Sequence, residues 1–197
     1  MTKILGLDEV GRGALAGPVM VGAVLLDSVD EEALLTELLL VAKWPKLRDS
    51  KKATERQKER IASWLPTAKV QMVVGVAEAY EVDKFRITGA VKLAAGRAIE
   101  QLQATGAVID HVEADASLFH PYEKELPTSR TIKGDENILA IALASIWAKV
   151  YRDTYMKQLF DPGFGYAEHV GYGTPRHLAA IKQLGLSDQH RRSFCHE

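Results

Sequence analysis

The sequence contains a single cysteine, Cys195, near the end of the chain. One cysteine excludes an intramolecular disulfide and a zinc site built from cysteines. Long apolar runs are also missing, because no segment approaches the roughly 18 apolar residues of a membrane span. The N-terminus has no charged leader followed by an apolar region. These absences lead us to expect a cytoplasmic protein without a membrane segment.

Neither sign of charge is in excess, since 25 Lys and Arg residues stand against 26 Asp and Glu residues, for a net charge of −1. The basic residues are nevertheless concentrated in residues 43–60 and 176–192. Basic patches on a neutral chain, with carboxylates elsewhere, fit a protein that binds a polyanion and keeps a negative pocket for metal ions. Two solvated helix faces are the alternative interpretation.

The order of the expected helices and strands indicates the fold class. Apolar, β-branched runs predict strands over residues 4–10, 19–26, 70–76, 108–115 and 131–133. Helical periodicity predicts helices over residues 31–40, 54–65 and 138–159, and a further helix capped by Asp83 and ended by Gly106. Strands that first follow one another and then alternate with helices predict an α/β protein with a mixed five-stranded sheet flanked by helices.

At 197 residues the chain has room for one domain of ordinary size. Beyond Pro162 its composition changes, because loops rich in glycine and tyrosine precede a short helix over residues 175–184. This last part is too small to be an independent domain. We therefore expect a main domain over residues 1–160 and a small helical C-terminal lobe over residues 161–197.

An apolar run near the N-terminus carries Asp8 and Glu9 and passes into a glycine-rich loop. Adjacent side chains of a regular strand point to opposite faces, so these two acids converge only if the strand ends or kinks there. Gly11 and Gly13 supply that freedom and let backbone N–H groups approach a phosphate or a hydroxyl, and Arg12 suits an anionic ligand. A glycine turn with a surface ion pair is the alternative.

Four carboxylates are expected at strand ends or just beyond them: Asp8, Glu9, Asp115 and Asp135. Clustered acids without basic partners repel one another, so such a cluster implies bound cations. Ligands that are all oxygen atoms favour hard cations, Mg²⁺ or Mn²⁺. Two such ions about 3.5–4 Å apart catalyse phosphodiester hydrolysis, a reaction that also explains the basic segments.

Several of these residues have a second interpretation. Asp135 also fits the cap of the long helix, and Asp115 fits a turn residue, with Asp110 and Glu113 as competing acids on the same segment. Tyr172 lies between two glycines and is either a packed core residue or a platform on which a sugar or base stacks. The six histidines lack zinc-type spacing with a third ligand, which favours structural or phosphate-adjacent roles.

Several short segments carry a resemblance to a known family. They are DEVGRG (8–13), LAGPV (15–19), DSKK (49–52), KGD (133–135), ASIWAKVYRD (144–153), GYGT (171–174) and HRRSF (190–194). In composition and order they resemble the bacterial-type ribonuclease HII family, also called type 2 ribonuclease H. They span nearly the whole chain, so the match is highly specific.

The resemblance implies a ribonuclease H-like fold and hydrolysis of the RNA strand of RNA/DNA hybrids, including single ribonucleotides embedded in duplex DNA. It implies two-metal catalysis that leaves a 3′-hydroxyl and a 5′-phosphate. Carried over by position, Asp8, Glu9, Asp115 and Asp135 would be the catalytic carboxylates, and they would bind Mg²⁺ or Mn²⁺.

The same resemblance implies a set of substrate contacts. Gly11, Arg12 and Gly13 would read the 2′-hydroxyl at the RNA–DNA junction, Tyr172 would stack on the sugar of the next deoxynucleotide, and Lys51 would contact the substrate. The 2′-hydroxyl distinguishes RNA from DNA without any reading of sequence. The expected partners are RNA/DNA hybrid and ribonucleotide-containing duplex DNA, bound by a monomer.

One position departs from the family pattern, because Ala116 follows Asp115 where the family usually carries glycine. This change is the one feature that favours a rival function, a catalytically silent module that binds RNA/DNA hybrids. A metal-dependent nuclease of similar fold that acts on DNA alone is a second rival.

Overall fold

The computed structural model describes residues 1–47 and 52–195. Its strands are β1 (Lys3–Val10), β2 (Val19–Asp27), β3 (Val70–Ala77), β4 (His111–Asp115) and β5 (Thr128–Thr131). The α-helices are α1 (Glu31–Ala42), α2 (Glu55–Trp64), α3 (Ala79–Ala104), α4 (Gly134–Asn137), α5 (Leu139–Gln158), α6 (Tyr166–His169) and α7 (Pro175–Leu184). Short 3₁₀ helices cover Ser28–Asp30, Leu65–Thr67 and Arg192–Phe194. Within these ranges no helix is both long and apolar enough to cross a membrane.

The five strands form one mixed sheet in the order β3-β2-β1-β4-β5. The pairs β1–β2 and β2–β3 are antiparallel, and the pairs β1–β4 and β4–β5 are parallel. The predicted mixed sheet and its N-terminal hairpin are therefore confirmed. In the parallel pair of β1 and β4, Leu7 lies opposite Ala114. The two strands therefore place Asp8 and Asp115 at the same end of the sheet.

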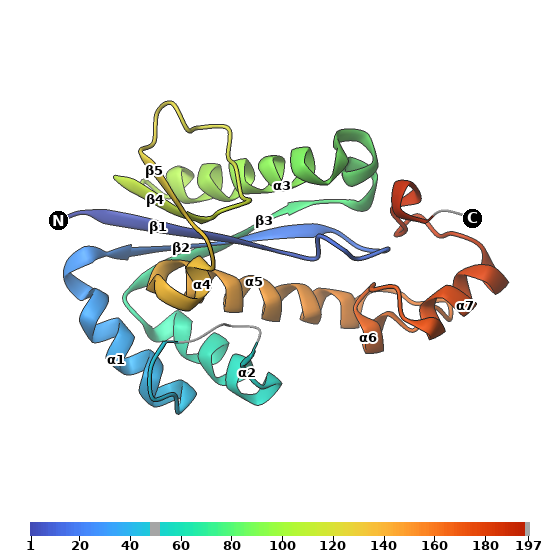
Figure 1. Ribbon diagram of the computed structural model, residues 1–197, viewed down its shortest axis with the longest axis horizontal. Helices are drawn as coiled ribbons and strands as arrows, with labels where there is room; N and C mark the ends of the chain where they lie inside the picture. The colour runs from blue at the N-terminus through green and yellow to red at the C-terminus, as the bar shows by residue number, and fades with distance from the viewer. Residues whose placement is uncertain (48–51, 196–197) are drawn as a thin grey trace.

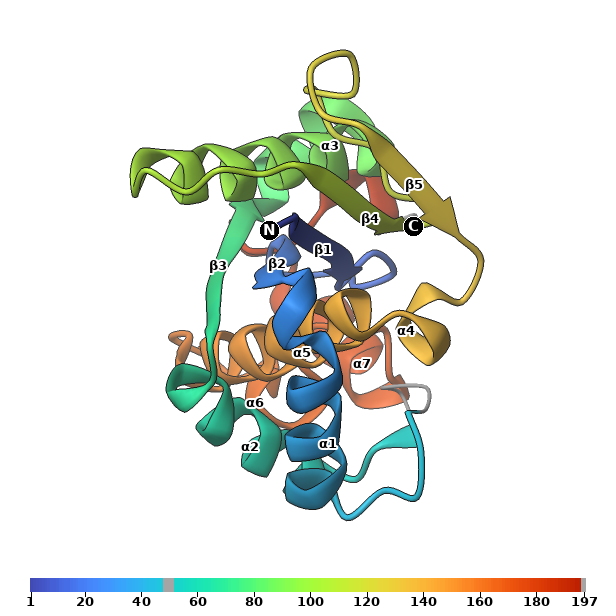
Figure 2. The ribbon, with the colours of Figure 1, turned by 90° about the vertical axis from the view of Figure 1, so that its left-hand side faces the viewer.

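Helices cover both faces of the sheet (Figure 1). One face packs against α3, and the other packs against α5 with α1 and α2 beyond it, as the rotated view also shows (Figure 2). The C-terminal lobe (α6, α7 and the following residues) lies beyond the end of the β1–β2 hairpin (Figure 1). This arrangement places the apolar first half of α5 in the core, as its sequence predicts.

Glycine allows α5 to approach the centre of the sheet closely. A Cβ atom at Gly6 would collide with the backbone of Ala140, and one at Gly22 would collide with the backbone of Ala144. The small side chains of α5 at these contacts complete the close packing. The next residue of the helix, Ser145, is consequently held near Asp8 on β1.

The structure corrects two strand boundaries. β4 begins at His111 rather than at residue 108, because Asp110 uses its side chain to accept a hydrogen bond from the Lys3 backbone before the parallel pairing begins. β5 covers Thr128–Thr131 rather than residues 131–133, because its register is set by the parallel pairing of Val112 with Thr128. Local composition carries no information on that register.

The predicted start of the third helix is also wrong. α3 begins at Ala79 with a capping box between Glu78 and Glu81, and it contains a kink at Arg86, whose φ of 60° is not helical. Asp83 therefore lies inside the helical segment rather than before it. Its carboxylate accepts hydrogen bonds from the backbone N–H groups of Arg192 and Ser193 and from the Ser193 hydroxyl.

Asp83 is expected to stabilise the docking of the C-terminal residues. Burial acts to raise its pKa, but hydrogen bonds from Ser193 and Arg192 outweigh burial and hold the pKa below its usual value. This contribution to stability is present above the unfolded pKa and is lost as the pH falls through the folded pKa. We expect Asp83→Asn to lower the free energy of unfolding by about 1–2 kcal/mol in urea titrations, since one charge-assisted acceptor is lost. An equal loss in the exposed control Asp188→Asn would contradict this assignment.

Candidate active site

Asp8 occupies the centre of the site. The alternation of β1 sends Leu5 and Leu7 into the core against α3, so Asp8 faces α5. Burial raises the pKa of Asp8 to about 8; a hydrogen bond from Ser145 opposes this shift, and the charges of Glu9, Asp135 and Asp115 add to it. All four carboxylates that the sequence singles out are thus close enough to interact.

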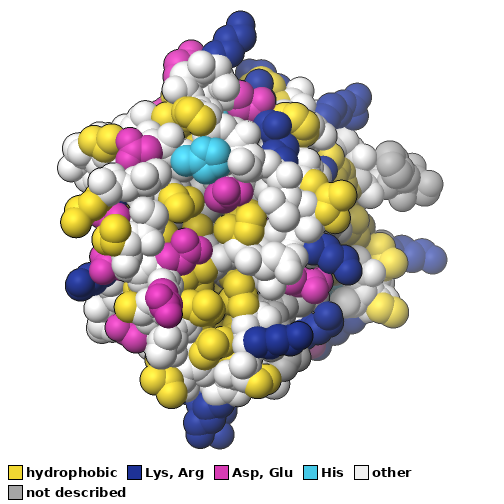
Figure 3. Space-filling model, turned by 60° about the vertical axis from the view of Figure 1, so that its left-hand side comes forward, with side chains coloured by type: hydrophobic (Ala, Val, Ile, Leu, Met, Phe, Trp, Pro, Cys, Tyr) yellow, Lys and Arg dark blue, Asp and Glu magenta, His cyan; other side chains and the backbone are white. Residues whose placement is uncertain are grey.

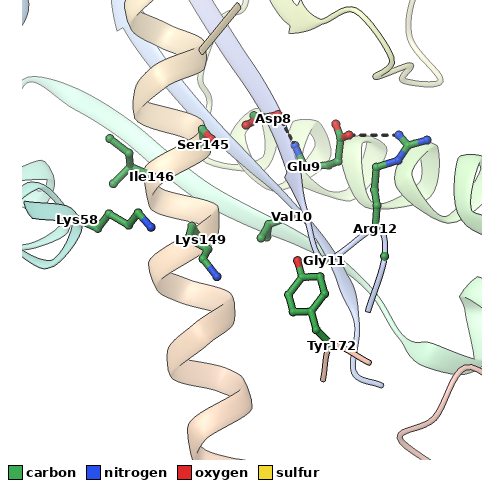
Figure 4. Close-up of a pocket in the computed structure, with 11 residues that line it drawn as sticks. Asp8, Glu9, Val10, Gly11, Arg12, Lys58, Ser145, Ile146, Lys149 and Tyr172 are labelled. Carbon is green, nitrogen blue, oxygen red and sulfur yellow. Dashed lines mark hydrogen bonds and ion pairs between the residues drawn. The ribbon is translucent and has the colours of Figure 1, made fainter. Parts of the chain in front are cut away.

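Glu9 and Asp8 lie on opposite sides of the strand (Figure 4). The expectation that β1 ends or kinks at this pair is wrong, because the strand continues to Val10. The four acids come close together without a kink in β1, because Asp115 and Asp135 approach Asp8 from neighbouring elements. Glu9 Oε1 lies 3.2 Å from Arg12 Nη1, and Glu9 Oε2 is buried with no hydrogen-bond partner among the described residues.

Asp115 and Asp135 line a hollow of about 410 Å³ that also contains Lys52, Ser117 and Lys133. It adjoins the Asp8 region, because the Ser117 hydroxyl lies 3.4 Å from Glu9 Oε1 and 3.5 Å from Arg12 Nη1. Asp135 is buried in the first turn of α4, which fits its expected place before the long helix. The backbone φ of Ala116 is not positive, so the backbone at this position does not require glycine.

A second cavity, of about 360 Å³, lies between β1 and α5. Asp8, Glu9, the segment 11–13 and Tyr172 form one part of its wall, and Lys58, Ser145 and Lys149 form another (Figure 4). Sequence reasoning assigned no role to these last three residues. The signal for Ser145 and Lys149 was their spacing with Asp153 at intervals of four, which places a serine, a lysine and an acid on one face of a helix otherwise rich in apolar residues.

The type and arrangement of the donor atoms decide whether this site fits a metal ion. In the described part of the chain no group of three or more His, Cys, Asp or Glu side chains is arranged so that it could hold an ion. The chemistry of the donors nevertheless fits a divalent cation, because every candidate ligand is a carboxylate oxygen. Two observations agree with this fit: the pKa of Asp8 is raised by burial among other acids, and Glu9 Oε2 is buried without a partner. Added positive charge would relieve both.

Two buried arginines hold the loop that follows β1. The Arg191 guanidinium donates to the carbonyl oxygens of Gly11, Arg12 and Gly17, and it is 0% exposed. Burial lowers its pKa to about 9, and the charge of the second buried arginine, Arg152, adds to this shift. Arg191 therefore does not belong to an exposed basic patch, as its sequence neighbourhood suggested. Its Nε and Nη1 atoms instead donate to main-chain oxygens, whereas Nη2 is buried without a hydrogen-bond partner among the described residues.

Acidic and basic side chains are largely separated on the side of the molecule seen in Figure 3. Acidic side chains lie mainly in the left half of that view, and most Lys and Arg side chains lie along its right side, with hydrophobic side chains between them. Lys58 from the first basic segment is buried and lies 2.9 Å from Glu55. Lys51, a predicted substrate contact, lies outside the described residues.

Comparison with known proteins identifies the family. A family model described as Ribonuclease HII matches residues 5–197. The chain is 41% identical to "Ribonuclease HII" of Geobacillus thermodenitrificans, over 98% of this chain and 68% of that protein. It is 42% identical to "Ribonuclease HII" of Nitrosococcus oceani, over 98% of this chain and 88% of that protein. The chain belongs to the ribonuclease HII family.

Solved structures agree with this membership. The ribonuclease H2 of Pyrococcus horikoshii superposes with a TM-score of 0.72 at 25% identity, over 98% of this chain and 93% of that one. Bst-RNase HIII, solved in complex with Mn²⁺, superposes with a TM-score of 0.68 at 20% identity, over 98% of this chain and 64% of that one, and shows the fold alone. The predicted ribonuclease H-like fold is confirmed.

Membership of the ribonuclease HII family also gives the class of reaction. The chain is a metal-dependent endoribonuclease that cleaves the RNA strand of RNA/DNA hybrids. Its metal is a divalent cation. The structure thus places an acidic site, a basic wall and a glycine loop in a protein that must bind a polyanion and a cation together.

Proposed function

We propose that this ribonuclease HII chain cleaves single ribonucleotides embedded in duplex DNA as well as longer RNA/DNA hybrids. We further propose that Asp8, Glu9, Asp115 and Asp135 hold two divalent cations for this reaction. The observation that carries the proposal is the buried carboxylate of Asp8, whose pKa is raised to about 8 beside the three other acids. A carboxylate kept in such surroundings is costly unless a cation binds there.

Bound Mg²⁺ or Mn²⁺ would supply an activated water and stabilise the charge that develops on the phosphate in an in-line displacement. The chain itself orients the ligands. Ser145 donates a hydrogen bond to Asp8, and the Glu9 backbone N–H donates to Asp8 Oδ1 at 2.9 Å. Lys149 and Lys58 line the same cavity, where they pair with Asp153 and Glu55, and they are proposed to contact a phosphate on the side away from Asp8 and Glu9.

Substrate selection is assigned to the loop after β1 and to the ring of Tyr172. Gly13 is exposed and leaves the backbone open to a ribose, Gly11 lines the same cavity, and Arg12, which pairs with Glu9, lies where it can bind a 2′-hydroxyl or a phosphate. Tyr172 lines the same cavity and presents a flat ring for a sugar. Lys51 is retained as a proposed substrate contact from the family pattern.

The proposal is tested with an end-labelled DNA duplex that contains one ribonucleotide. An all-DNA duplex and a long RNA/DNA hybrid serve as comparison substrates, each with Mg²⁺, with Mn²⁺ and with EDTA. We expect metal-dependent cleavage on the 5′ side of the ribonucleotide, which leaves a 3′-hydroxyl and a 5′-phosphate, and no cleavage of the all-DNA duplex. Cleavage of the all-DNA duplex would indicate a DNA nuclease. Binding by folded protein without any cleavage would indicate a silent module.

Arg12→Ala is expected to reduce the preference for ribonucleotide over deoxyribonucleotide by about 10-fold or more, because a charge-assisted contact is lost. The measurement is kcat/KM on the duplex with one ribonucleotide, divided by kcat/KM on the all-DNA duplex or by the detection limit of the assay where that duplex is not cut. Lys69→Ala is the matched control, since Lys69 directly precedes β3 at the opposite end of the sheet and pairs with Asp30. An unchanged preference in Arg12→Ala would remove this arginine from the selection of ribose.

A further inference from the structure

Three buried histidines form part of the interior of the C-terminal lobe beside Tyr172: His169, His177 and His190. The rings of His169 and His177 stack with their centroids 4.2 Å apart. His177 Nδ1 lies 2.9 Å from the Tyr172 carbonyl oxygen, and His177 Nε2 lies 3.1 Å from His190 Nε2. A chain of contacts therefore runs from the interior of the lobe to the main chain of a residue that lines the catalytic cavity.

The partners at the two ends of this chain determine where each proton lies. A carbonyl oxygen only accepts, so His177 Nδ1 carries a proton and donates it to Tyr172. At the other end the Ser187 backbone N–H donates to His190 Nδ1 at 2.9 Å, so His190 carries its proton on Nε2. The contact between the two Nε2 atoms is then a hydrogen bond from His190 to His177. Both rings are neutral, and each has a single allowed tautomer.

The surroundings keep both rings neutral. Burial lowers the pKa of His177, and burial together with the neighbouring His177 ring lowers the pKa of His190 to about 4. Other groups also face the pair: Asp161 acts to raise the pKa of His177, and the ring of His169 and the guanidinium of Arg192 act to lower the histidine pKa values. The proton assignment is therefore the one expected at neutral pH.

We propose that His177 is a positioning residue for substrate binding, which holds the main chain of Tyr172 so that its ring stays at the catalytic cavity, while His190 fixes the tautomer of His177. The inference rests on the substrate contact proposed for Tyr172. Tyr172 lies between Gly171, whose φ is +86°, and Gly173, and glycine neighbours broaden the conformations open to a turn. Backbone hydrogen bonds from Tyr172 to His169 and from Thr174 to the Tyr172 carbonyl already restrict this turn, and His177 adds a second donor to the same carbonyl. A side-chain donor from α7 to the Tyr172 carbonyl removes part of that freedom.

The same pair of histidines connects Tyr172 with the loop after β1. His190 forms a β-bridge with Ala16 of that loop, and the adjacent Arg191 donates to the carbonyl oxygens of Gly11 and Arg12. Hydrogen bonds from the adjacent residues His190 and Arg191 therefore reach Tyr172, through His177, and the segment 11–12.

Two near-isosteric substitutions separate positioning from packing. In His177→Asn the amide nitrogen can take the place of Nδ1 and still donate to Tyr172, whereas in His177→Gln it can take the place of Nε2 and leaves the carbonyl without this donor. Both variants lose the ring stacked on His169, so the thermal midpoint serves as the matched measure of packing loss. Assays are run well below that midpoint on the duplex with one ribonucleotide.

We expect His177→Gln to raise KM by about 3- to 10-fold with little change in kcat, as the loss of one hydrogen bond predicts. The KM of His177→Asn should stay within about 2-fold of the KM of the unmodified chain. In a Tyr172→Ala background His177→Gln should have no additional effect on KM, because the two changes act through one contact.

Equal KM values for the Asn and Gln variants, or a full effect of His177→Gln in the Tyr172→Ala background, would overturn the inference and leave the proposed function intact. An unchanged KM in Tyr172→Ala alone would remove the proposed substrate contact of Tyr172, and the inference with it. The unmodified chain is assayed first on the duplex with one ribonucleotide. Absence of cleavage in that assay would contradict the proposed function, and with it the substrate contact on which the inference rests.

Discussion

Replacement of Asp8 by asparagine is expected to abolish metal-dependent cleavage while the fold and the binding of RNA/DNA hybrid persist. The loss in kcat should be on the order of 10³-fold or more, because several kcal/mol of charge stabilisation depend on a correctly held cation. The same change should raise the thermal midpoint in EDTA. A neutral amide removes a carboxylate that is buried beside Glu9, Asp115 and Asp135, and such trade-offs between stability and function are common at active sites.

The pH dependence of stability provides a second measurement on Asp8. Its pKa is about 8 in the folded chain and 3.8 when unperturbed, so between these values the folded state binds more protons than the unfolded state. The contribution of this group to stability is therefore fully present at low pH and is lost as the pH rises towards 8. We expect Asp8→Asn to remove this part of the pH dependence, as measured by urea unfolding in EDTA.

A matched control is Asp110→Asn, because Asp110 precedes β4 at the end of the sheet opposite to Asp115. This variant should retain cleavage and the pH dependence of the unmodified chain. Cleavage by Asp8→Asn at a near-normal rate would contradict the central role given to Asp8. Loss of hybrid binding together with cleavage would show that Asp8 also supports the substrate surface.

The parts of the fold that sequence predicts correctly depend on local patterns. The β1–β2 hairpin follows from two β-branched runs on either side of a glycine loop, and the helix α2 begins at the capping box of Thr54 and Gln57 as expected. Asp8, Glu9 and Asp115 could be selected because each lies at or near the end of an apolar strand, and Asp135 because it precedes the long helix. Their closeness then follows from the parallel pairing of β1 and β4.

The parts that sequence does not predict depend on contacts between distant residues. Asp83 resembles a helix cap, yet its partners are Arg192 and Ser193, more than 100 residues away. Arg191 resembles a surface cation, yet three carbonyl oxygens from the other end of the chain solvate it in the interior. Nothing in the local sequence of either residue identifies those partners.

Gly11→Ala should have the largest effect on stability among the single changes considered for the loop after β1. Gly11 has a φ of +85°, and a Cβ atom there would collide with the side chain of Arg152. A left-handed conformation without glycine costs about 1–2 kcal/mol and overpacking costs about 1–3 kcal/mol, so the expected loss is about 2–5 kcal/mol. The measurement is the free energy of unfolding in urea.

Gly13→Ala is the matched control in the same loop. No described heavy atom lies within 4 Å of the position of its Cβ, and its φ is not positive. Its free energy of unfolding should therefore change by no more than about 0.5 kcal/mol. Equal destabilisation by the two alanines would show that the loop responds to any loss of glycine and that the contact with Arg152 is not the cause.

The effect of Gly11→Ala should extend from stability to catalysis because of what Arg152 holds. Its guanidinium donates to the carbonyl oxygens of Ala16, Pro18 and Val170, and these hydrogen bonds join the loop after β1 to the C-terminal lobe. A displacement of about 1 Å there would misplace substrate relative to the carboxylates and cost on the order of 10²-fold in kcat/KM. The assay is made under conditions where circular dichroism shows the variant fully folded. A normal kcat/KM in a destabilised Gly11→Ala would show that the loop supports the fold without positioning the substrate.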